Sequence, residues 1–192
     1  MPLELERLVG DVKWAQAHRF PAREVTAMLK RLVAAAPEGS AERRFARLEL
    51  ASMLLEQDPW LAARLAKDAL RDQVDARAWS VLGIAHSLLG NYRSALRAHR
   101  AAVSLAPEAA DHEHNLGHLL DVAFNRPLSA LPHLRRAHHA LPDEPEITSS
   151  LCHALVRVGR RNEAERLLTG AFAGDAERAR ATIGAWLRDD EG

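Results

Sequence analysis

The stretch that decides the fold is WSVLGIAH at residues 79–86, followed by GNY at residues 90–92. Small residues recur at helical spacing on both sides of a glycine turn, and the segment ends at a proline. This pattern predicts two short helices joined by a tight turn. The downstream positions that complete the pattern are Ala95, His99, Ala102 and Pro107.

The same pattern recurs along the chain with a period of about 34 residues. Leu116 and Gly117 repeat the Leu-Gly pair of residues 82–83, and Cys152 takes the place of the glycine in the following period. A small residue is needed there because one helix crosses its hairpin partner, and a larger side chain would force the two apart. Cys152 is therefore expected to be a small buried hydrophobe. The residues expected to face these positions are Ala95, Ala130 and Ala164.

The pattern resembles that of the tetratricopeptide repeat, W-x₂-L-G-x₂-Y followed by A-x₃-F and P. His86 stands in place of the tyrosine and His99 in place of the phenylalanine. The resemblance implies an all-α fold, a right-handed α-solenoid of helix-turn-helix repeats with a C-terminal capping helix. In this family the first helix of each repeat lines a concave groove that binds a partner segment. The resemblance thus also implies a protein-protein interaction module, such as an adaptor, scaffold or assembly factor.

We predict one continuous structural domain with three parts. Residues 1–40 form an N-terminal helical pair, a candidate diverged repeat, and residues 175–192 form a capping helix and a short tail. A cap is expected because a solenoid otherwise leaves its last apolar face in water. Residues 41–174 hold four tetratricopeptide-like repeats, at 42–75, 76–109, 110–144 and 145–174. In the first of these, Glu49 stands where a small residue belongs.

Composition and charge narrow the classes of function. The 26 basic and 26 acidic side chains give a formal net charge of zero, which disfavours a nucleic-acid binder because such proteins usually carry a basic excess. No apolar run approaches the roughly 20 residues of a membrane-spanning helix. The acidic start of the chain, MPLELE, does not fit a signal peptide. We therefore expect a cytoplasmic protein that makes no contact with a membrane.

The sequence contains no motif for catalysis or for a cofactor. It has no phosphate-binding glycine-rich loop, no paired cysteines with zinc spacing and no nucleophile elbow. The prolines and most of the glycines already have turn, cap or packing roles, so little irregular backbone is left for an active site. We predict a protein that is not an enzyme and that needs neither a metal nor a cofactor.

The expected binding surface is the face that the first helices present to the groove. Arg77 and Arg157 are candidate anchors for acidic groups of the partner, a protein or peptide of unknown identity. Ile84 and Val122 are among the candidate apolar contacts. The complete set is Leu50, Met53, Arg77, Ser80, Ile84, His114, His118, Asp121, Val122, Ser149, His153 and Arg157.

Two other functions remain open as alternatives. The first is a metal-binding enzyme or sensor, because three groove histidines and Asp121 are side chains that zinc or a similar metal accepts. These histidines are His114, His118 and His153. The second is nucleic-acid binding through an Arg-rich outer face, where a stripe of cations at helical spacing could meet phosphates. This stripe consists of Arg93, Arg97 and Arg100.

A chaperone-type carboxylate clamp is disfavoured. Chaperone-binding members of the family grip a C-terminal carboxylate with Lys, Asn and Arg side chains on the first helices. Such a clamp needs charge-assisted donors to replace the water around the carboxylate. In this chain only Asn115 falls at one of these places, and the others hold Ser80, Ile84, Glu146 and Ser150.

Overall fold

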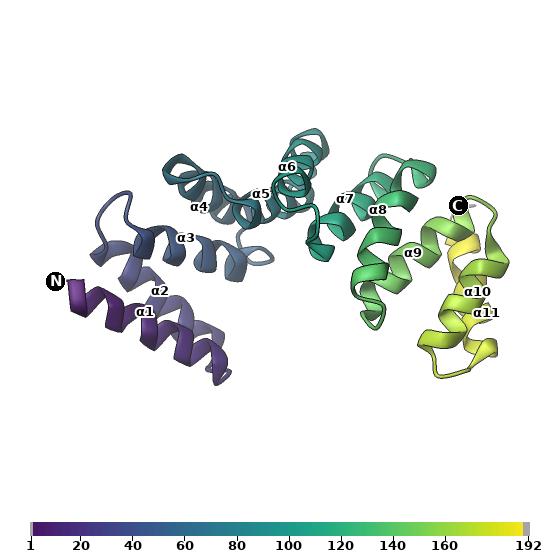
Figure 1. The fold of residues 1–192 in the computed structure, drawn as a ribbon, viewed down its shortest axis with the longest axis horizontal. Coiled ribbons are helices and arrows are strands. Elements are labelled where there is room, and N and C mark those ends of the chain that lie inside the picture. The colour runs from purple at the N-terminus through teal and green to yellow at the C-terminus, as the bar shows by residue number, and fades with distance from the viewer. Residues whose placement is uncertain (1, 190–192) are drawn as a thin grey trace. The chain divides into compact units, whose positions relative to one another are not determined.

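The computed structural model describes residues 2–189, and over this range the chain forms eleven α-helices and no strand (Figure 1). This confirms the all-α class. The helices are α1 Pro2–Ala17, α2 Ala22–Ala35, α3 Ala41–Leu54, α4 Pro59–Asp72, α5 Ala76–Leu88, α6 Tyr92–Leu105, α7 Ala110–Val122, α8 Pro127–Ala140, α9 Pro145–Arg157, α10 Arg161–Ala171 and α11 Ala176–Asp189.

The chain divides into two compact units, an N-terminal unit Met1–Ala98 and a C-terminal unit His99–Gly192, with the boundary inside α6. In the first unit each helix from α1 to α5 packs on the next, and in the second the same holds from α7 to α11. Alternate helices also touch, α3 with α5 and α7 with α9. Contacts to the next helix and to the next but one are typical of stacked helical hairpins. The single continuous domain and the repeat boundaries stay predictions.

The turns follow from local sequence. Ser40 and Asp58 are N-caps, whose side chains accept hydrogen bonds from the backbone N–H groups of the first turns of α3 and α4. Two turns end in a left-handed residue, Gly90 with φ 71° and Gly159 with φ 80°, which a glycine adopts without strain. The break between α1 and α2 lies at Arg19, which has a φ of 54° and is followed by Phe20 and Pro21.

Small residues lie where the helices cross. Ala130 and Cys152 are fully buried, and the Cys152 Sγ lies 3.6 Å from the carbonyl oxygen of Ala164, as expected. At Gly117, however, the nearest neighbour is Leu134 and not Ala130: a Cβ there would lie 2.7 Å from the Leu134 Cγ. Leu134 is one turn beyond Ala130 on the same face of α8, and its longer side chain reaches back over the glycine.

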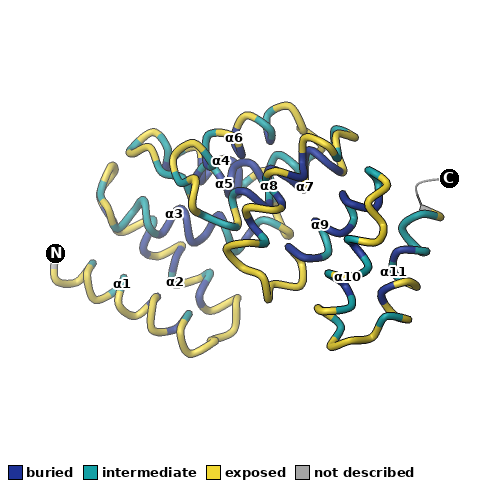
Figure 2. The backbone as a smooth tube through the Cα atoms, turned by 45° about the vertical axis from the view of Figure 1, so that its right-hand side comes forward, coloured by how far each residue is buried: buried dark blue, intermediate teal, exposed yellow. Residues whose placement is uncertain are grey.

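From α3 to α10, more residues are buried on the first helix of each hairpin than on the second. Figure 2 shows long buried stretches on α3, α5, α7 and α9, whereas α1 is mostly exposed. On the last helix, Ala179 and Ile183 are buried, so α11 packs through the apolar face that the sequence predicts. Among the described residues, no helix is both long and apolar enough to cross a membrane.

Candidate functional site

The predicted groove residues fall into two groups, one in each unit. In the N-terminal unit they lie on α3 and α5, which contact each other. Leu50 and Ser80 are buried there, whereas Met53 and Ile84 are partly exposed and Arg77 is exposed. Only the last three can therefore meet a partner directly. In the C-terminal unit the remaining seven residues lie on α7 and α9. Four of them, His118, Val122, Ser149 and His153, line a cavity.

In the N-terminal unit Arg77 already has a carboxylate partner. Its Nη1 donates to the Glu49 Oε1 over 2.5 Å, and the Glu49 Oε2 accepts a second hydrogen bond of 2.7 Å from the Gln16 amide. Glu49 is buried, so the exposed guanidinium of Arg77 neutralises a charge that would otherwise be costly. The sequence analysis did not predict this ion pair. The signal for it was Glu49, an acidic residue at a position where the repeat has a small residue.

In the C-terminal unit Asp121 is the centre of a second charge network. This residue is only 1% exposed, and its Oδ1 accepts a 2.7 Å hydrogen bond from the Arg157 Nη1. The same Nη1 also donates to the Asp121 carbonyl, and the Arg157 Nη2 bonds the side chain of Asn125. His153 donates through Nδ1 to the Asp121 Oδ2 over 2.6 Å. Each carboxylate oxygen of Asp121 thus accepts a hydrogen bond from a side chain of α9.

A cavity of about 230 Å³ lies next to this network. Ser150 connects two imidazoles on α7: its Oγ is 2.9 Å from the His114 Nε2 and 3.4 Å from the His118 Nδ1. His114 is buried, and burial lowers its pKa, so its ring is neutral at pH 7. The residues that line the cavity are His118, Val122, Ser149, Ser150, His153 and Trp186.

Trp186 and Ser150 are the lining residues that the sequence did not assign to the site. Trp186 belongs to α11, which packs on α9, and its ring meets the His153 ring edge-on with 5.5 Å between the centroids. A helix expected only as a cap therefore also forms one wall of the cavity. The signal for this role was weak, because an apolar stripe on a terminal helix predicts packing in general.

The three groove histidines do not converge on one point. His114 and His118 lie beside Ser150, whereas His153 is bonded to Asp121. Across residues 2–189, no three His, Cys, Asp or Glu side chains are placed to hold a metal ion. The arrangement in this part of the chain therefore offers hydroxyl and imidazole hydrogen-bonding groups and an aromatic wall.

Comparisons with known proteins bear on the fold. No family model matches the chain. Protein FlbA of Caulobacter vibrioides is 35% identical over 126 residues, which is 64% of this chain and 21% of FlbA. The chain thus spans about a fifth of the length of that relative.

Solved structures resemble almost the whole chain. TTC0263, a thermophilic TPR protein of Thermus thermophilus, has a TM-score of 0.71 and 19% identity, covering 95% of this chain and 98% of its own. MamA of Desulfovibrio magneticus RS-1, from residue 41 to its end, has a TM-score of 0.70 and 16% identity, covering 90% and 96%. Identities this low carry information on the fold alone. Together with the recurring helical hairpins, they show that the chain has the tetratricopeptide repeat fold, an all-α solenoid.

Proposed function

We propose that this chain is a non-catalytic protein-interaction module that binds a segment of a partner protein on the first-helix face of α7 and α9. The observation that carries the proposal is the cavity beside Asp121. It lies on the helices that tetratricopeptide-like proteins use for binding, and side chains from α7, α9 and α11 line it. At about 230 Å³ it is smaller than the roughly 300–1,000 Å³ of small-molecule sites, so it suits one inserted side chain.

The chemistry of the lining favours an uncharged insertion. The charge of Asp121 is balanced by Arg157, and His114 is neutral. What remains for a ligand is the exposed imidazole of His118, the hydroxyls of two serines and the apolar surfaces of Val122 and Trp186. An amide or apolar side chain of a peptide would find hydrogen-bonding groups on one wall and an aromatic ring on the other.

The geometry also supports a binding role over hydrolysis. A serine hydrolase needs one imidazole that bridges the carboxylate and the nucleophilic hydroxyl. Here His153 bonds Asp121, but Ser150 bonds His114 and His118 instead. The three groups of a triad are thus close together without forming the relay that activates a serine.

The test selects peptides and then maps where they bind. Peptides that bind the full chain are selected from a displayed random library. The tightest binder is then synthesised, and its affinity is measured by fluorescence anisotropy. Val122→Asp on α7 is compared with Leu128→Asp on α8. The two residues are 56% and 74% exposed, and both changes add one negative charge to the C-terminal unit.

We expect Val122→Asp to weaken binding by about tenfold or more, because a charge enters a partly desolvated contact. Leu128→Asp should leave the affinity within about twofold, since surface changes outside the interface have small effects. The proposal fails if Leu128→Asp abolishes binding while Val122→Asp does not, or if no selected peptide responds to Val122→Asp. Circular dichroism confirms that both variants keep their helix content.

A further inference from the structure

A second surface with different chemistry lies on the second-helix side of the N-terminal unit. It begins with α4, where long side chains recur every three or four residues and therefore share one face. The opposite face of α4 is buried through residues such as Leu65 and Ala66. The residues on the outer face are Trp60, Arg64, Lys67 and Arg71, all exposed, with Trp60 at 69%.

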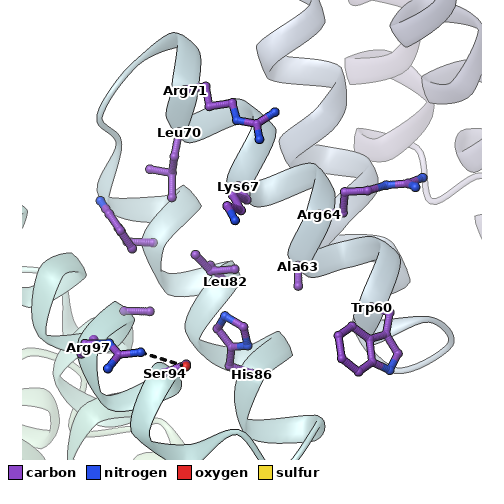
Figure 3. A pocket seen from close by; sticks show the side chains of 12 residues that line it. Trp60, Ala63, Arg64, Lys67, Leu70, Arg71, Leu82, His86, Ser94 and Arg97 are labelled. Atoms are coloured by element: carbon purple, nitrogen blue, oxygen red, sulfur yellow. Dashed lines mark hydrogen bonds between the residues drawn. The ribbon is translucent and has the colours of Figure 1, made fainter.

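This face borders a cavity of about 700 Å³, which we call the cationic cleft (Figure 3). Its apolar floor comes from α4 and α5, and the first turns of α6 complete it with Arg97, which donates a 3.1 Å hydrogen bond to the Ser94 hydroxyl. Among residues 2–189, no aspartate or glutamate lines it. The lining residues are Trp60, Ala63, Arg64, Lys67, Leu70, Arg71, Trp79, Leu82, His86, Ser94, Arg97 and Ala98.

The acids nearest in sequence neutralise one of the four cleft cations, Arg71, and leave the other three. Asp68 pairs with Arg71 at 2.9 Å, and Asp72 turns to Arg47 at 3.2 Å. Asp58 and Asp75 accept backbone N–H groups as helix N-caps. Within the described part of the chain, the cleft cations without a carboxylate partner are Arg64, Lys67 and Arg97.

His86 lies beside the same positive charges. It lines the cleft, and its Nδ1 is buried without a hydrogen-bond partner. Burial lowers the pKa of this imidazole, and the charges of Arg97 and Lys67 lower it further. No carboxylate of the described residues is among the groups that shift this pKa. The cleft thus combines an apolar floor with positive charge from two helices, an arrangement complementary to negative charge around an apolar group.

We propose that the cationic cleft is a second docking site, which takes an acidic segment of a partner protein with an apolar or aromatic side chain between its carboxylates. The apolar side chain would insert against Trp79 and Leu82, and the carboxylates would pair with Arg64, Lys67 and Arg97. Residues 60–71 extend about 16 Å along α4 at the rise of an α-helix. A partner helix of about three turns, with acids every three or four residues, matches this spacing.

An acidic protein segment fits these observations better than a nucleic acid does. The chain as a whole carries 26 basic and 26 acidic residues, so it lacks the basic excess of most nucleic-acid proteins. The cleft has a recessed apolar floor, which a phosphate backbone does not fill. A base stacked on Trp60 beside Arg64 is the competing arrangement, and the test includes it.

The test uses the full chain and a synthetic fluorescent peptide of about 12 residues, with glutamates spaced every three or four positions around one Trp and one Leu. A matched peptide carries glutamine at every glutamate position, and a dT oligonucleotide of similar length represents nucleic acid. Arg64→Glu/Lys67→Glu is compared with Lys30→Glu/Arg31→Glu. The control pair lies exposed on α2 of the same unit and changes the net charge equally.

We expect the acidic peptide to bind the wild-type chain at least about tenfold more tightly than the glutamine peptide. Arg64→Glu/Lys67→Glu should weaken binding of the acidic peptide by at least about tenfold. Lys30→Glu/Arg31→Glu should weaken it by less than about twofold. Trp60→Ala tests the apolar contribution without changing the charge, and a loss of affinity is expected.

Three results would overturn the proposal. The first is no measurable binding of the acidic peptide. The second is an equal loss in both charge-reversal pairs, which would mean attraction to the whole surface. The third is tighter, cleft-dependent binding of the oligonucleotide, which would assign the cleft to nucleic acid. Val122→Asp should leave the acidic peptide's affinity unchanged, so failure here is distinct from failure at the α7–α9 cavity.

Discussion

Adding a single methyl group at Gly117 should destabilise the C-terminal unit, although alanine is the better helix former. A Cβ at Gly117 would lie 2.7 Å from the Leu134 Cγ, 2.9 Å from its Cδ2 and 3.2 Å from its backbone nitrogen. Leu134 is fully buried, so its side chain has no open space to move into, and the backbone of α8 must shift as well.

The size of the effect follows from two opposing contributions. Replacing glycine by alanine inside a helix gains about 1 kcal/mol. Overpacking a close helix crossing costs about 1–3 kcal/mol. Gly117→Ala should therefore lower the free energy of unfolding by up to about 2 kcal/mol. Gly170→Ala on α10 is the matched control, because a Cβ there meets nothing within 4 Å. It should gain up to about 1 kcal/mol.

Urea unfolding followed by circular dichroism measures both variants. A double variant, Gly117→Ala/Leu134→Ala, then tests the cause, because the smaller residue 134 leaves room for the new methyl group. The two changes should be less than additive by about 1–3 kcal/mol. If Gly117→Ala stabilises the chain as much as Gly170→Ala does, the close crossing of α7 and α8 is wrong.

Two further predictions concern buried ionisable groups. Arg157→Met should lower the free energy of unfolding in urea by about 3–5 kcal/mol, because it leaves the Asp121 carboxylate buried without its guanidinium. The double variant Asp121→Asn/Arg157→Met should recover much of this loss. A cost below about 1 kcal/mol for Arg157→Met would contradict the network. Burial of His99, 2% exposed, lowers its pKa from 6.5 to about 4. As the pH falls, the unfolded chain therefore takes up a proton on His99 before the folded chain does. The contribution of His99 to the free energy of unfolding is complete above pH 6.5, and about 3 kcal/mol is lost as the pH falls towards 4. His99→Phe should remove that part of the pH dependence of unfolding, and an unchanged slope would refute it.

The sequence predicted the fold well because the fold depends on local signals that recur. Gly90 and Gly159 mark turns, Pro59 and Pro127 begin helices, and the small residue at position 152 marks a crossing. Each of these constraints acts within one hairpin of the chain. Such local signals act without any contact between distant parts of the chain.

The site was less predictable because its contacts join helices of successive hairpins. Arg77 and Arg157 were expected to be available to a partner, but each pairs with a carboxylate one hairpin earlier in the chain. A single sequence shows which residues are charged, but it does not show which of them lie close together in the fold. Likewise, the Arg stripe was expected on α6 alone, whereas Arg97 joins the cations of α4 around one cavity. Pairing between helices depends on their packing, which periodicity does not specify.

Cys152 gives the α9–α10 hairpin a natural probe of its own opening. It is the single cysteine of the chain, it is fully buried, and burial raises the pKa of its thiol to about 12. Only the thiolate reacts with alkylating reagents. In the closed hairpin Cys152 is therefore protected because the reagent cannot reach it and because its thiol stays protonated. If opening costs about 5 kcal/mol, labelling slows by about 10³–10⁴-fold relative to the unfolded chain. The labelling rate of the unmodified protein thus measures how often this hairpin separates, and whether a bound partner peptide holds it closed.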